Sequence, residues 1–317
     1  RMVKEMGITV PVTACIGKGD LYGAVGGVDG ILPTLNLYPE DREPGIEEGL
    51  LRVVSDFTNR NLPVIVTETG RNHLLLRRLL SAGVKGLAPF LQVSGTNFGF
   101  WTSVNDWKKP LAFLTTDSDF GGMIDPAGRL RAEYYEGRLL AGFISSFTEE
   151  LLQAKPTFSN DVRCSNPQIG AMGNEGTQKM QSLIAPNGTV FLFPANLTDS
   201  DLETRITLAG ETFPRFSRFF VKKDRVPIVV YRLPLDKWGI PAVLEYTTSE
   251  LYYLGVIGGE TVMIIYGEDS TPGEIAISPC SVGVRMDLFK NCPKDDITLT
   301  RDKDRLILTY NHDQEKL

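Results

Sequence analysis

The chain has 317 residues, 42% of them hydrophobic and 23% charged, with 33 Lys and Arg against 39 Asp and Glu and a formal net charge of −6. Such a chain is long enough for two globular domains, and its small negative charge gives no electrostatic reason to expect nucleic acid or an anionic membrane as a partner. A neutral polar substrate fits this charge better. No apolar stretch reaches the roughly 18 residues of a membrane-spanning helix, so we expect no membrane span.

The start of the sequence and its cysteines and histidines limit the kinds of protein this chain can be. It opens at Arg1 in a helix-like run, RMVKEMG, without a signal-peptide layout, and we interpret it as an internal fragment of a longer protein. No CxxC occurs and the histidines are far apart, so we expect no metal and no cofactor. Cys280 and Cys292 would close a short disulfide loop in an exported protein. The location and the oligomeric state stay open, with an extracellular or periplasmic location favoured over the cytoplasm.

The first half of the chain has the rhythm of β/α units, because short apolar runs alternate with amphipathic segments up to about residue 147. Strands are predicted at 8–14, 30–38, 62–68 and 84–93, and helices at 45–59, 73–82 and 128–152, the last opened by Asp125-Pro126. Four consecutive parallel strands fit either half of an eight-stranded barrel or part of a doubly wound sheet.

Polar residues at the ends of the predicted strands favour the barrel. Asn36 and Tyr38 end the second strand, Glu68 ends the third, and Gln92 ends the fourth before the loop at 95–101. A barrel would bring these ends together at one mouth. The Gly-rich segment 17–30 lacks the strand-to-helix context and the GK[ST] ending of a phosphate loop, so we predict a loop at the barrel face.

The second half of the chain reads as a separate β-domain. Residues 166–317 alternate apolar and polar side chains in short runs broken by Gly, Pro, Asn and Asp, which is typical of antiparallel strands. We therefore predict a first domain at 1–146, a linker at 147–165 and a β-rich domain at 166–317. Two glycosylation tripeptides, at Asn187 and Asn196, would matter only in a eukaryotic secretory pathway.

Three motifs occur in a fixed order in the first half. TETG at 67–70 is followed by GTNFGFW at 95–101 and by TTDSDFGGMIDPAGRL at 115–130, which leads into AEYYEGRLLAGF at 132–143. This ordered set resembles the family-35 glycoside hydrolases, the β-galactosidases. The stretches 189–202, 244–254 and 260–277 resemble strands of that family's second domain.

The resemblance implies strands five to eight of a (β/α)8 TIM barrel followed by a mainly antiparallel all-β domain. It implies a retaining exo-β-galactosidase that hydrolyses terminal β-D-galactosyl residues of oligo- or polysaccharides, with Glu68 as the nucleophile. Tyr38 would donate a hydrogen bond to Glu68. The alternatives are purely structural roles: Glu68 caps its turn or pairs with Arg71, and Tyr38 is a core or interface residue.

A sugar-binding group follows from the same resemblance. Asn97, Phe98 and Trp101 in the GTNFGFW loop, together with Phe120, are the candidate substrate contacts, because an aromatic face suits the C–H groups of a sugar ring. Asn97 has an alternative role in holding the turn of its own loop.

Departures from the family pattern keep functions other than β-galactosidase activity open for this chain. Ser118 and Phe120 stand where the family has two tyrosines, which brings galactose specificity into question and favours a different β-glycoside, such as a glucosaminide, or a non-catalytic carbohydrate-binding homologue. The resemblance places the acid/base Glu on a fourth strand upstream of this chain. We therefore expect the fragment alone to be inactive.

Overall fold

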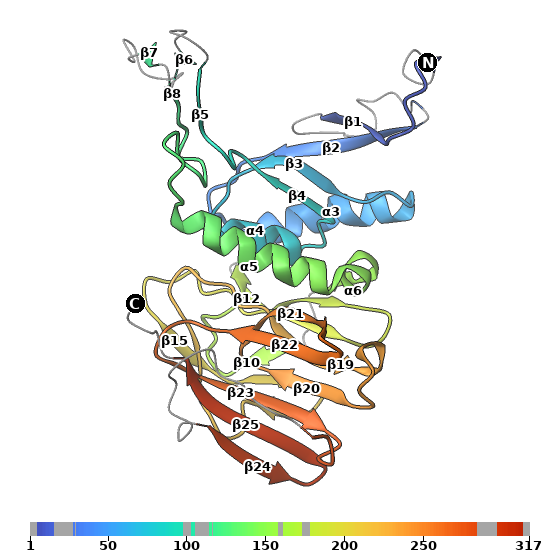
Figure 1. The fold of residues 1–317 in the computed structure, drawn as a ribbon, viewed down its shortest axis with the longest axis vertical. Helices are drawn as coiled ribbons and strands as arrows, with labels where there is room; N and C mark the ends of the chain where they lie inside the picture. Colours follow the sequence, from blue (N-terminus) through green and yellow to red (C-terminus); the bar gives the residue numbers. More distant parts are fainter. Residues whose placement is uncertain are drawn as a thin grey trace. The chain divides into compact units, whose positions relative to one another are not determined.

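The computed structural model describes residues 5–15, 28, 30–97, 103–104, 114–115, 117–157, 161–172, 178–283 and 297–312. The chain divides into two compact units that interleave in sequence. Unit 1 contains Arg1–Asp41, Arg52–Asn72 and Val84–Tyr135, and unit 2 contains Arg42–Leu51, His73–Gly83 and Glu136–Leu317. The fold is mixed α/β with mostly antiparallel strands (Figure 1). No helix among the described residues combines the length and apolar character needed to cross a bilayer.

Unit 1 contains a four-stranded sheet in the order β1-β2-β3-β4, drawn from blue to teal in Figure 1. All three neighbouring pairs are parallel, so the predicted parallel pairing is confirmed. The bounds are β1 Val12–Cys15, β2 Ile31–Leu37, β3 Ile65–Thr69 and β4 Gly86–Pro89. The Gly-rich segment predicted as a loop lies mostly outside the described residues.

Two short antiparallel strand pairs follow β4 in unit 1. Gly95–Thr96 (β5) pairs antiparallel with Asp117–Ser118 (β8), and Ser103–Val104 (β6) pairs with Leu114–Thr115 (β7). The GTNFGFW motif thus begins on β5.

The helices predicted at 45–59 and 73–82 are confirmed to within one residue at each end, and the prediction of a single helix at 128–152 was wrong. The helices are α3 Ile46–Asn59, α4 His73–Ser81, α5 Ala132–Ser146 and α6 Thr148–Gln153. The segment 128–152 was predicted as one helix, but Asp125 accepts the backbone N–H groups of Ala127 and Arg129 in a turn that delays the start. Phe147 then interrupts the helix with a non-helical φ of −118°, and its fully buried ring packs against Phe143 at 5.0 Å.

Unit 2 is built on an antiparallel sheet of eight described strands, in the order β24-β25-β23-β20-β19-β14-β13-β9. The bounds are β9 Lys155–Thr157, β13 Gln181–Ile184, β14 Val190–Phe193, β19 Val229–Pro234, β20 Val243–Thr247, β23 Thr271–Ser278, β24 Thr298–Asp302 and β25 Arg305–His312. The range 147–165, predicted as a linker, contains α6 and β9, and β9 forms one edge of this sheet.

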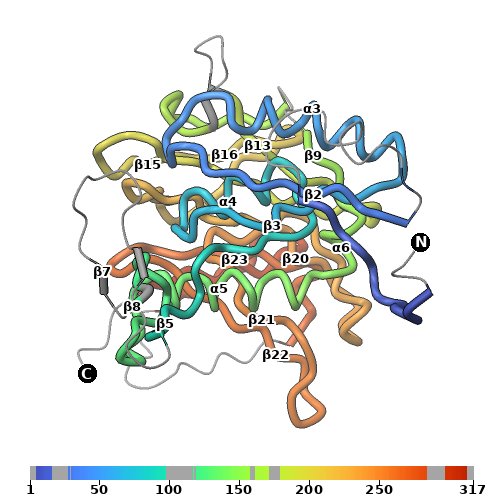
Figure 2. Tube along the Cα trace, turned by 90° about the horizontal axis from the view of Figure 1, so that it is seen from above, coloured from blue at the N-terminus to red at the C-terminus, as the bar shows by residue number. Residues whose placement is uncertain are grey.

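Smaller sheets complete unit 2. They are β10 Arg163–Cys164 with β16 Ile206–Leu208 and β17 Glu211–Phe213; β11 Ala171–Met172 with β12 Gln178–Lys179; β15 Leu202–Thr204 with β18 Phe219–Val221; and the hairpin β21 Glu250–Ile257 with β22 Glu260–Tyr266. A short 3-10 helix spans Asp236–Trp238. Figure 2 shows the β21–β22 hairpin in orange, extending as an arm of this unit.

The core of unit 2 is aromatic at its centre. The ring of Phe213 stacks between Tyr231, at 5.6 Å between centroids, and Tyr246, at 4.7 Å. The cluster around them includes Leu192, Val229, Ala276 and Ile307, all fully buried. Burial of this apolar surface is the main driving force for folding of the β-rich region.

A buried carboxylate ties a loop of unit 2 to this core. Glu274 on β23 is fully buried, and its oxygens accept the backbone N–H groups of Arg215, Phe216 and Ser217. The hydroxyl of Tyr246 also donates to Glu274, at 2.7 Å. Four donors offset the cost of burying one charge.

The two glycosylation tripeptides differ in exposure. Asn187 lies exposed in the turn between β13 and β14. Asn196 is fully buried, its side-chain amide donates to the carbonyls of Ser200 and Val221, and its oxygen accepts the hydroxyl of Thr198 at 2.7 Å. Cys280 is half-buried, and its predicted disulfide partner Cys292 lies outside the described residues.

Candidate active site

Glu68 lies at the C-terminal end of β3, where the strand departs from regular alternation. Leu35 of β2 pairs with Val66, but Asn36 pairs with Glu68, so Thr67 is an extra residue on β3. Strict alternation would leave Glu68 on the same face as the buried Val66. The irregularity leaves Thr69 buried and Glu68 half-buried, which is how β-bulges re-aim side chains near functional sites.

Two donors from β2 and its end hold the Glu68 carboxylate, one at each oxygen. The side-chain amide of Asn36 donates to Oε2 at 2.8 Å, and the hydroxyl of Tyr38 donates to Oε1 at 2.7 Å. The hydrogen bond expected between Tyr38 and Glu68 is therefore present. Both donors are uncharged, and together they fix the orientation of the carboxylate.

The orientation of Asn36 follows from a third side chain. The hydroxyl of Thr67 lies 3.3 Å from the Asn36 side-chain oxygen and 3.1 Å from the Thr34 hydroxyl. A donor near its oxygen leaves the NH₂ group of Asn36 facing Glu68. The extra residue of the bulge thus also helps to orient a ligand of the carboxylate.

Tyr38 keeps its proton under neutral conditions. Partial burial, the hydrogen bond to Glu68 and the charge of Glu68 together raise the pKa of the Tyr38 hydroxyl well above its usual value, and Arg71 opposes them. The ring is 51% exposed, so the side chain lies at the surface of unit 1. A protonated, accessible hydroxyl beside a carboxylate suits a site that takes a ligand from solvent.

Arg71 does not serve as the ion-pair partner of Glu68. Its guanidinium donates instead to the main-chain carbonyls of Phe90, at 3.0 Å, and Phe120, at 2.6 Å. A Cβ at Gly121 would collide with this guanidinium, and Gly121 has φ of +70°. Arg71 therefore fixes the segment around Phe120 against the end of β4.

Phe90 and Phe120 form an accessible aromatic pair. Their ring centroids are 6.3 Å apart with a tilt of 56°, and the two residues are 39% and 36% exposed. Phe120 was predicted as a substrate contact, whereas Phe90 was not. Exposed aromatic faces whose backbone is anchored by Arg71 are suited to packing against an apolar face of a ligand.

A charged network fixes the segment that carries Phe120. The guanidinium of Arg131 donates to both oxygens of Asp119, at 3.0 and 2.8 Å. Ser94 and the backbone N–H of Gly121 donate to the same carboxylate. The hydrogen bonds from Arg131, assisted by these donors, hold the pKa of Asp119 well below its usual range. Asp119, which the sequence motif contains, thus has a positioning role.

The remaining predicted contacts are only partly described. Asn97 directly follows β5 and is half-buried. Phe98 and Trp101 lie outside the described residues, as does the side chain of Ser118. Asn36 and Phe90 are the residues that sequence reasoning missed as contacts, and the polar end of the predicted strand was the signal for Asn36.

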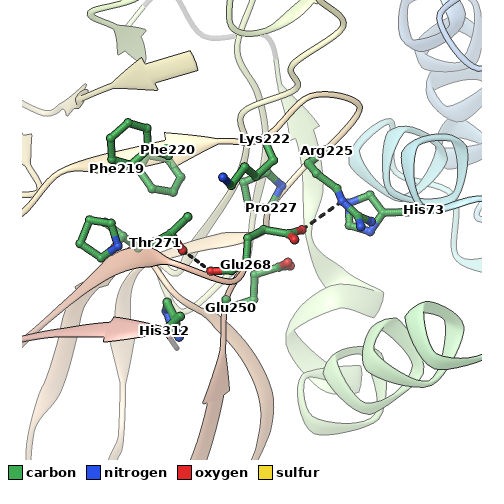
Figure 3. A pocket seen from close by; sticks show the side chains of 13 residues that line it. His73, Phe219, Phe220, Lys222, Arg225, Pro227, Glu250, Glu268, Thr271 and His312 are labelled. Atoms are coloured by element: carbon green, nitrogen blue, oxygen red, sulfur yellow. Dashed lines mark hydrogen bonds and ion pairs between the residues drawn. The ribbon is translucent and has the colours of Figure 1, made fainter. Parts of the chain in front are cut away.

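A second cluster of titratable groups lies in unit 2 and surrounds a narrow cavity of about 30 Å³. Figure 3 shows Arg225 paired with Glu268, at 3.0 Å, beside His73 and Glu250. The buried Arg77 pairs with Glu250 and also donates to Tyr266. The cavity has room for about one water molecule, so these groups stabilise the fold rather than accommodate a substrate.

The comparisons with protein families and with curated proteins gave no match for this chain. Within the described ranges, no group of three or more His, Cys, Asp or Glu side chains is placed to hold a metal ion. The site presents the hydrogen-bonded carboxylate of Glu68, and unit 1 also carries the accessible aromatic pair Phe90 and Phe120.

Proposed function

We propose that this chain is the nucleophile-bearing part of a retaining glycoside hydrolase that acts on terminal β-galactosyl residues, with Glu68 as the nucleophile. The observation that carries the proposal is the carboxylate at the end of β3 with one neutral donor, Asn36 or Tyr38, at each oxygen. These two hydrogen bonds would hold the carboxylate in one orientation for attack on a substrate. Galactose is proposed as the sugar because the ordered TETG, GTNFGFW and TTDSDFG motifs resemble those of β-galactosidases.

In the proposed mechanism the Glu68 carboxylate attacks the anomeric carbon, and the bond to the leaving oxygen breaks as a second carboxyl group gives that oxygen a proton. Water, deprotonated by the same second group, then hydrolyses the glycosyl ester. Retaining enzymes hold the two groups about 5 Å apart. The resemblance assigns the second group to a strand that would precede Arg1. Asn36 and Tyr38 would hold the nucleophile through both steps.

The parallel order β1-β2-β3-β4 is compatible with strands five to eight of a (β/α)8 barrel. In such a barrel the carboxyl ends of the strands carry the chemistry, which is where Glu68 lies. The antiparallel sheet of unit 2 would then correspond to the family's second domain.

Covalent labelling tests the identity of the nucleophile. The full-length protein is incubated with a 2-deoxy-2-fluoro-β-galactoside that has a good leaving group, and the adduct is located by peptide mass spectrometry. We expect the label on the peptide that contains Glu68. An adduct on another residue, or hydrolysis with no accumulation of any adduct, contradicts the proposal.

Chemical rescue tests the role of Glu68 independently. Glu68→Gly leaves space for azide on the face that the carboxylate attacks, so azide should restore turnover and give the α-galactosyl azide. An acid/base residue would instead give the β-azide. Glu40→Gly, at an exposed carboxylate in the loop after β2, is the matched control and should hydrolyse substrate normally without forming either azide.

One observation favours a second candidate function, a β-glycosidase with a different sugar preference. Phe120 places an exposed aromatic ring, 36% accessible, where the family has a tyrosine hydroxyl. A panel of chromogenic β-glycosides that includes a glucosaminide separates the two: preference for the galactoside supports the first proposal, and Phe120→Tyr should shift preference toward it. Binding of a sugar with no hydrolysis of any member would identify a non-catalytic homologue.

A further inference from the structure

A cleft lined by residues other than those around Glu68 lies in unit 2 between α5 and β21. Its volume is about 490 Å³, inside the range of about 300–1,000 Å³ that is typical of small-molecule sites. Tyr252, Tyr253 and Leu254 form one wall, and Arg138 with a row of small residues that includes Ser145 forms the other. β21 runs beside α5 in both Figure 1 and Figure 2.

A β-bulge places both tyrosines in this cleft. Leu251 pairs with Ile265 and Tyr253 with Ile264, so Tyr252 is an extra residue on β21. Because a bulge breaks the alternation of side chains, two consecutive residues reach the same face. Leu251 and Leu254 are buried, whereas Tyr252 and Tyr253 are half-buried and line the cleft.

Glycines on both walls fix how the two rings lie. A Cβ at Gly142 of α5 would collide with the ring of Tyr252, and a Cβ at Gly255 would collide with the hydroxyl end of Tyr253. The hydroxyl of Ser146 accepts the backbone N–H of Leu254 at 3.3 Å, which joins β21 to α5. The aromatic wall is therefore held in position before any ligand arrives, a condition that reduces the entropic cost of binding.

We propose that this cleft is a carbohydrate-binding site that takes a neutral disaccharide or longer sugar chain. A sugar ring has an apolar C–H face that packs on a tyrosine ring, and a rim of hydroxyl groups that pairs with the tyrosine hydroxyls and Ser145. Arg138 is the one charged residue among those that line the cleft, and its guanidinium N–H groups can donate to sugar hydroxyl groups. The site goes beyond the proposed hydrolysis, because neither Glu68 nor its hydrogen-bond donors are among the residues that line it.

Direct binding measurements test the site. Glu68→Gln protein, in which hydrolysis should be blocked, is titrated with β-linked galactobiose, cellobiose, xylobiose and chitobiose, using saturation-transfer NMR and calorimetry. We expect at least one disaccharide to bind, and Tyr253→Ala to weaken that binding by about five- to tenfold, as loss of an aromatic contact does. Tyr253→Phe keeps the ring and should lose less. Ser145→Arg fills the cleft without altering either tyrosine and should abolish binding.

Tyr135→Ala, at an exposed tyrosine nearer the start of α5 that is 55% accessible, is the matched control and should bind normally. Circular dichroism checks that each variant is folded, and Ser145→Arg decides the question if Tyr253→Ala is not. The proposal is overturned if no disaccharide binds, or if binding is unchanged by both Tyr253→Ala and Ser145→Arg. Tyr253-dependent binding without labelling of Glu68 would refute only the hydrolase proposal, and labelling without such binding would refute only this one.

Discussion

Glu274→Gln is expected to destabilise unit 2 strongly, because the carboxylate is fully buried and accepts four hydrogen bonds. A glutamine amide offers one acceptor oxygen. Whichever way it turns, its NH₂ group faces two donors: Arg215 N–H and the Tyr246 hydroxyl on one side, or the N–H groups of Phe216 and Ser217 on the other. Each buried donor left without an acceptor costs about 1–3 kcal/mol, so the pair costs about 2–6 kcal/mol.

Urea unfolding followed by tryptophan fluorescence gives this free energy directly. Tyr246→Phe removes one donor and should cost about 1.5–3 kcal/mol, the usual value for a hydrogen bond to a charged group. Burial and the hydrogen bond to Glu274 raise the pKa of Tyr246 well above its usual value, so its hydroxyl donates at all neutral pH values.

The double variant completes a thermodynamic cycle. Both variants change the contact between position 274 and Tyr246, so the two changes should couple by about 1 kcal/mol or more. A loss below about 0.5 kcal/mol for Glu274→Gln, the size of an ordinary surface substitution, would refute the reasoning. So would strictly additive effects combined with a small loss for each single variant.

Three further predictions concern the candidate site, the core and the charged cluster. Tyr38→Phe in the full-length protein should lower kcat/KM by about tenfold, because the Glu68 carboxylate loses one of its two side-chain donors; an unchanged kcat/KM contradicts this. Phe213→Ala should lower the free energy of unfolding by about 3–5 kcal/mol, read from the urea midpoint. Burial, with the neighbouring Arg charges, lowers the pKa of His73 well below its ordinary 6.5. Unfolded chains therefore bind a proton that folded ones exclude, and stability falls as pH drops below about 6.5. His73→Gln, which keeps an acceptor for the Val226 N–H, should lose less stability than the wild type between about pH 7 and pH 5; equal losses would contradict this.

Much of the candidate site was predictable, because parallel strands end at a common edge of their sheet. That rule brings Tyr38 to Glu68 from the two strand predictions alone. The same rule places Asn36 at this edge, but it does not reveal the extra residue Thr67, since a bulge depends on how two strands pair and not on either strand's own sequence.

Tertiary partners explain what else the sequence did not reveal. Arginine side chains are mostly exposed in proteins, yet Arg77 and Arg78 of α4 are both buried, because Glu250 and Glu47 pair with them. These partners lie far away in sequence. The same contacts draw 42–51 and 73–83 into unit 2, a division that no run of linker-like composition marks.

The buried Asn196 bears on how the protein is produced for experiments. Its side-chain amide is already committed to two main-chain carbonyls in the interior, so an attached glycan would have to be added before folding and would then exclude the native arrangement. During secretion from a eukaryotic host, glycosylation of Asn196 would thus compete with folding. Bacterial expression avoids that competition. Correctly folded protein secreted from a eukaryotic host is expected to carry sugar at Asn187 and not at Asn196.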